Sequence, residues 1–77
     1  MNANLEDLDD WDDEKAHELH ITVSTSLSGK ARSNAIHELA KLARDGSANA
    51  AYALRLIARS STSSIDRELA SRELAKA

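Results

Sequence analysis

Residues 31–46 read ARSNAIHELAKLARDG. At about 100° per residue, the apolar side chains fill one half of a helical wheel and the polar side chains fill the other half. The apolar half consists of Ala31, Ala35, Ile36, Leu39, Ala40, Leu42 and Ala43. This amphipathic pattern predicts a helix from about Ser28 to Arg44 that packs on a core with one face.

A second helix is expected directly after the first. The turn between them contains Gly46, which can take the left-handed conformation that ends a helix, and Ser47, which can cap the next one. So short a link forces an antiparallel or strongly angled helical hairpin. Residues 48–59 are apolar on almost every side, which predicts the central element of the fold. Their only polar strip consists of Tyr52, Arg55 and Arg59.

Two more helices are predicted at the ends of the chain. Acidic residues crowd the first turn of a segment from Asp9 or Asp10 to His20, where the helix dipole favours negative charge. The last helix runs from Ile65 to about Lys76, capped by Ser63 or Ser64. Because residues 21–29 are β-branched and serine-rich, they are expected to form a connector. The organisation is an acidic arm or helix at 1–20, a connector at 21–29 and a helical body at 30–77, in one all-α bundle of about four helices.

The last helix has a weak apolar face. Its apolar residues Ile65, Leu69, Ala70, Leu74 and Ala77 spread over half of the wheel. Asp66 and Glu73 fall between them. Because this leaves the core incomplete, we expect the first helix to fold back over the body, together with some self-association of the chain.

An internal repeat links the two halves of the body. Residues 66–76, DRELASRELAK, align with residues 31–41, ARSNAIHELAK, and six of the eleven positions are identical. At the same offset of 35 residues, Ser26 and Ser28 match Ser61 and Ser63. A period of about 20–50 residues built from paired helices is typical of an α-solenoid.

Residues 28–77 resemble a HEAT-type helical repeat. The resemblance rests on an arginine and an alanine early in the helix at 31–44, a short turn, the apolar residues 50–57 and a second arginine–alanine start at 66–70. It covers about one and a half units, fewer than the roughly three that a solenoid normally needs. The resemblance implies antiparallel helix pairs that act as a scaffold for protein contacts without chemistry of their own.

The net charge of −3 is unevenly distributed. Residues 1–20 carry eight acidic residues and one basic residue, whereas residues 21–77 carry nine basic and five acidic residues. Such asymmetry marks an interaction tail, or a tail that folds back on its own body. The most unusual part of the arm is Leu8, Asp9, Asp10, Trp11, Asp12 and Asp13. It could dock in a partner groove as a short amphipathic helix, imitate nucleic-acid phosphates, or pack on the body through Trp11.

Metal binding and catalysis have little support. Asp13, His17 and His20 could share one helix face, but His17-Glu18-Leu19-His20 lacks the spacing of the zinc-protease motif. The chain has no cysteine and only two glycines, which excludes a thiolate site and argues against a phosphate-binding loop. Neither a Ser–His–acid order nor a Gly-x-Ser-x-Gly elbow is present. We therefore expect no metal, no cofactor and no enzymatic activity.

Direct nucleic-acid binding and membrane insertion are also disfavoured. Arg55 and Arg59, with Arg44 and Lys41, make only a modest basic patch, and the isoelectric point of about 5.5 argues against phosphate-driven affinity. No apolar run approaches about 20 residues, and the N-terminus is acidic, so neither a membrane span nor a signal peptide is expected. The expected location is the cytoplasm.

These patterns predict a small non-catalytic adaptor or regulator that binds a partner protein through its helical surface and its acidic arm. The expected contacts are the arm residues 8–13 and the strip of Tyr52, Arg55 and Arg59. The alternative is an inhibitor from a phage or mobile element, whose acidic face mimics nucleic acid and blocks a nucleic-acid-binding complex.

Overall fold

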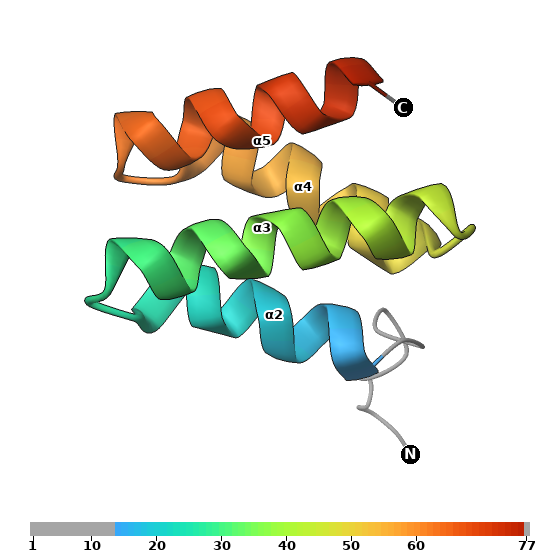
Figure 1. The fold of residues 1–77 in the computed structure, drawn as a ribbon, viewed down its shortest axis with the longest axis horizontal. Coiled ribbons are helices and arrows are strands. Elements are labelled where there is room, and N and C mark those ends of the chain that lie inside the picture. Colours follow the sequence, from blue (N-terminus) through green and yellow to red (C-terminus); the bar gives the residue numbers. More distant parts are fainter. Residues whose placement is uncertain (1–13, 77) are drawn as a thin grey trace.

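The computed structural model describes residues 14–76, which form four helices joined by short connectors (Figure 1). The helices are α2 (Glu14–Thr25), α3 (Gly29–Arg44), α4 (Ala48–Ser60) and α5 (Ser64–Lys76). No strand is present in this part of the chain. The all-α class and the small helical bundle predicted from the sequence are confirmed.

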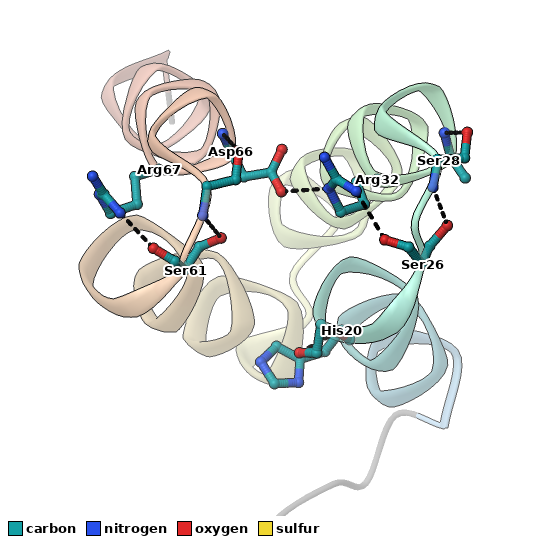
Figure 2. Close-up of polar contacts among 10 residues, drawn as sticks. His20, Ser26, Ser28, Arg32, Ser61, Asp66 and Arg67 are labelled. Carbon is teal, nitrogen blue, oxygen red and sulfur yellow. Dashed lines mark hydrogen bonds and ion pairs between the residues drawn. The ribbon is translucent and has the colours of Figure 1, made fainter.

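The four helices form two layers of two. Seen nearly along the helices, α3 and α5 lie side by side in one layer, and α2 and α4 lie side by side in the other (Figure 2). Consecutive helices run in opposite directions (Figure 1), so α2–α3 is one antiparallel hairpin and α4–α5 is a second. Because α3 and α4 each contact all the other helices and α2 does not contact α5, the two middle helices hold the bundle together.

The core lies between the layers and is rich in alanine, which lets the helices approach closely. The buried apolar residues are Ala16, Val23, Ala35, Ile36, Leu39, Ala40, Ala50, Ala53, Leu54, Ile57 and Ala70. Four of these residues belong to the predicted apolar half-wheel of α3. Another four, Ala50, Ala53, Leu54 and Ile57, come from α4. α4 lies centrally as predicted, but it shares this position with α3, which also contacts every other helix.

The turn between the hairpins has the geometry that its sequence predicts. The backbone N–H of Asp45 closes α3 on carbonyl oxygens of the last turn, and Gly46 has a φ of 108°, which favours glycine. Ser47 then caps α4, because its Oγ accepts a hydrogen bond from the N–H of Ala50 at 3.1 Å.

α2 corrects the expected boundaries, because it continues to Thr25 where the sequence predicted an end at His20. Val23 is buried in the core, and this packing overrides the weak helix propensity of the β-branched residues. The hydroxyls of Thr22 and Thr25 donate to carbonyl oxygens four residues earlier, so they are satisfied within the helix. The connector is therefore only residues 26–28, and the predicted helix start at residues 9–10 lies outside the described residues.

The sequence repeat recurs in the hydrogen bonds of the two connectors. The N–H of Ser28 donates to Ser26 Oγ at 3.1 Å, and the N–H of Ser63 donates to Ser61 Oγ at 3.3 Å. Ser28 Oγ accepts from the N–H three residues later at 3.2 Å, and Ser63 Oγ does so at 3.3 Å. Both serines thus cap the helix that follows them.

The arginine of each repeat extends this correspondence. Arg32 Nη1 donates to the carbonyl oxygen of Ser26 at 2.8 Å, and Arg67 Nη1 donates to that of Ser61 at 2.6 Å (Figure 2). Each guanidinium therefore ties the start of the second helix of its hairpin to the end of the first. The connectors of the two hairpins therefore make equivalent sets of contacts.

We predict that Leu54→Ala lowers the free energy of unfolding by about 2–5 kcal/mol, because Leu54 is 1% exposed in the central helix and its truncation leaves a cavity. Urea unfolding followed by circular dichroism measures this change. The matched control is Leu27→Ala at a side chain that is 99% exposed, which is expected to change the stability by no more than about 0.5 kcal/mol. Equal effects of the two substitutions would contradict the assigned core.

Candidate functional site

Arg32 joins the two hairpins through a buried carboxylate. Its Nε lies 2.8 Å from Oδ2 of Asp66, in the first turn of α5, while its Nη1 holds the carbonyl oxygen of Ser26 (Figure 2). Asp66 is only 2% exposed, and the arginine side chain is 24% exposed. A charge-assisted pair in so sheltered a position is stronger than one in open solvent. One guanidinium therefore connects three segments of the chain.

Glu73 forms a second buried acidic site between α3 and α5. Its Oε2 lies 3.3 Å from Nδ1 of His37 and 3.3 Å from Nζ of Lys76, and its Oε1 lies 3.6 Å from Nη1 of Arg44. Burial alone raises the pKa of Glu73, but the hydrogen bond and charge of Lys76, with the charges of His37 and Arg44, outweigh it. The pKa of Glu73 is therefore lower than its ordinary value of 4.5.

These two acids correct the interpretation of α5 as a helix with an interrupted apolar face. Asp66, Ala70 and Glu73 are all buried, at the i, i+4, i+7 spacing of one helix face. This face packs on α3, which supplies the counter-charges Arg32 and Arg44. The sequence contained the spacing as a signal, but the pairing becomes visible only when α3 and α5 are known to be neighbours.

The predicted strip of Tyr52, Arg55 and Arg59 lies exposed on α4. These two arginines are the only charged residues of the helix. Among residues 14–76, no ion pair includes either of them. Arg44, which the sequence placed with them in one basic patch, instead pairs with Glu73. The two arginines of the strip are therefore outside any ion pair of residues 14–76, whereas Arg44 is in one.

A groove of about 290 Å³ lies between α2 and α4. It is lined by His20, Val23, Ser24, Leu56, Ile57, Ser60, Ser61 and Thr62. A neighbouring hollow of about 360 Å³ lies at the connectors, and its lining includes Arg32 and Asp66. Both hollows combine apolar and hydroxyl side chains.

The metal site considered from the sequence, with Asp13, His17 and His20, lies only partly within the described residues. Asp13 lies outside them, and within residues 14–76 no group of three or more His, Cys, Asp or Glu side chains could hold a metal ion. Burial, with a smaller contribution from the charge of His17, lowers the pKa of His20 below its ordinary value of 6.5. Burial therefore favours the neutral form of His20.

The predicted contact residues of the acidic arm, Leu8, Asp9, Asp10, Trp11, Asp12 and Asp13, also lie outside the described residues. No helix between residues 14 and 76 is both long enough and apolar enough to cross a membrane. Comparison with protein-family models, with curated proteins and with solved structures gives no match to this chain. The candidate surfaces therefore rest on the geometry of the chain itself.

We predict that a double-mutant cycle of Arg32→Ala and Asp66→Ala gives a coupling energy of about 1.5–3 kcal/mol, because each partner alone leaves a sheltered charge uncompensated. Urea unfolding of the four chains measures this energy.

The control cycle uses Arg72→Ala and Glu68→Ala, an exposed pair on α5 at 3.1 Å. Its coupling is expected to be about 0–1 kcal/mol, since solvent screens both charges. A coupling between Arg32 and Asp66 as small as that of the control would contradict the role assigned to Arg32.

We predict that acid destabilises the protein partly through Glu73. Because the pKa of this carboxyl is lowered on folding, its contribution is complete above about pH 4.5 and is lost as the pH falls through the folded value. Glu73→Gln should therefore be less stable than the wild type at pH 7 and should lose less stability between pH 5 and about pH 3. Glu68→Gln, at an exposed position of the same helix, is expected to keep the full pH dependence. Identical pH profiles of Glu73→Gln and the wild type would contradict this account.

Proposed function

We propose that this chain is a small non-catalytic module that binds a partner protein in the cytoplasm. The observation that carries the proposal is the exposed strip of Tyr52, Arg55 and Arg59, whose arginines take part in no ion pair among residues 14–76. Tyrosine and arginine are enriched at the centres of protein interfaces, where they supply much of the binding energy. The strip therefore has the composition of a contact surface.

The rest of the bundle supports this proposal because its charged side chains hold helices together. Arg32 pairs with Asp66, and the basic side chains of His37, Arg44 and Lys76 surround Glu73. The HEAT-like resemblance agrees with a frame whose purpose is to present helix surfaces. A partner with an acidic surface would be attracted by the strip and held by its tyrosine.

The charge distribution favours a second candidate function. Residues 1–13 contain six acidic residues and no basic residue, whereas all ten basic residues lie in 14–77. A segment of this kind could occupy a nucleic-acid-binding surface of another protein, which would make the chain an inhibitor. Neutralising Asp9, Asp10, Asp12 and Asp13 together should then abolish a salt-sensitive complex without loss of helicity. A complex that persists after this change would eliminate mimicry.

We predict that Arg55→Gln/Arg59→Gln lowers the affinity for the partner about tenfold or more, because arginines at the centre of an interface often each contribute more than about 1 kcal/mol. The tagged full-length chain is used to capture the partner from its native host, and the affinity is then measured with the purified complex. The matched control is Lys30→Gln/Lys41→Gln, which removes the same charge from exposed positions of α3.

Equal retention of the partner by both double variants would move the contact away from α4. Failure to recover any protein partner, or turnover of a substrate by the purified chain, would overturn the proposed function itself.

A further inference from the structure

Arg32 and Arg67 occupy equivalent positions in the two hairpins but differ in their partners. Each donates through Nη1 to a connector carbonyl oxygen, at 2.8 and 2.6 Å. Arg32 also donates through Nε to Asp66, whereas no ion pair within residues 14–76 includes Arg67. Figure 2 shows that Arg67 lies on the side of the α4–α5 hairpin that faces away from α3. Arg32 lies on the corresponding side of the first hairpin, which faces α5. The second hairpin therefore repeats the arginine of the first hairpin, but without a carboxylate paired to it among the described residues.

The second hairpin carries two further arginines that no ion pair within residues 14–76 includes. At the offset of 35 residues, Arg55 and Arg59 correspond to His20 and Ser24, the α2 residues that line the groove against α4. Both arginines are exposed on α4, and neither lines the groove that α4 forms with α2. We call Arg55, Arg59 and Arg67 the basic edge.

The acids of the second hairpin do not neutralise this edge. Asp66 and Glu73 are buried toward α3, and the exposed Glu68 pairs with Arg72 at 3.1 Å. α4 contributes no acidic residue. Within the described residues, the basic edge is thus complementary in charge to an acidic surface. Arg67 also occupies the repeat position of Arg32, which contacts the other hairpin.

We propose that the basic edge binds a partner protein through a helix with a carboxylate in its first turn, which Arg67 Nε contacts as Arg32 Nε contacts Asp66. This proposal rests on the proposed protein-binding function and names its site and the chemistry of its partner. The occupant is a different protein, because a second copy of this chain would present Ala31 where the contact needs an acid, at the position equivalent to Asp66. Arg55 and Arg59 add attraction around the central contact.

The missing acid can be supplied to test the edge with purified chains. One chain, called the acid chain, is the full-length variant Ala31→Asp/Arg67→Gln, which offers a carboxylate at the position equivalent to Asp66 but has lost Arg67. The other chain, called the arginine chain, is the wild type, which keeps Arg67. Because Ala31 donates its N–H to the capping serine just as Asp66 does, the substitution retains the helix start. Sedimentation velocity and fluorescence titration of the mixture measure the complex, and circular dichroism checks the helicity of each chain.

The expected result is a 1:1 complex of the acid chain with the arginine chain. It should weaken about tenfold or more when the arginine chain carries Arg67→Gln. Arg67→Lys keeps the charge but not the fork of donors, so it should weaken the complex as well and guards against a folding defect of the glutamine variant. Arg72→Gln, which removes the same charge from an exposed site of α5, should leave the affinity unchanged. The natural partner, once captured, is expected to show the same order of affinities.

Three results would overturn the proposal. The first is that the acid chain and the arginine chain form no complex, and the second is that their complex does not depend on Arg67. The third is self-association of the wild type that Arg67→Gln abolishes, because a second copy of the chain would then be the occupant. These results are separate from the test of the proposed function. Failure to capture any natural partner would contradict the proposed function. The mixture of the acid chain and the arginine chain would still measure whether the basic edge binds a carboxylate.

Discussion

The contact between Arg32 and Asp66 is the interaction on which the arrangement of the two hairpins depends. It lies at the one end of the bundle where both connectors meet, and the same guanidinium fixes the end of α2 through Ser26. Asp66 is almost fully buried, so the pair has one well-defined geometry. Because the core is rich in alanine and has few large interlocking side chains, we expect this polar contact to help select one register of the helices.

The pairing of acidic and basic side chains between α3 and α5 also explains how charge is distributed over the surface. The acids of α5 that face α3 are consumed by Arg32, Arg44 and their neighbours, so the inner charges cancel inside the bundle. The exposed arginines of α4 and the half-buried Arg67 have no such counter-charges among residues 14–76. A small chain with few large apolar groups thus has a polar contact in its interior and, on its second hairpin, three arginines outside any ion pair of the described residues.

Helix content, the turn at Gly46 and the serine caps could be predicted from the sequence, because each depends on residues close together in the chain. The end of α2 could not, since burial of Val23 against other helices outweighs local propensity. Asp66 and Glu73 were taken for interruptions because a wheel drawn for one helix cannot show that its neighbour carries the matching cations. The exposed strip of α4 was predicted, whereas Arg67 gains meaning only from its likeness to Arg32.

Native-state hydrogen exchange tests most directly whether Arg32 and Asp66 hold the hairpins together. In the wild type, amides in the middle of α3 and α5 are expected to exchange with similar opening free energies, as one cooperative unit. In Asp66→Asn, the amides of α5 should open at a lower free energy than those of α3, because α5 has lost its charged link to the first hairpin. Equal lowering in both helices, or no change in α5, would contradict the account.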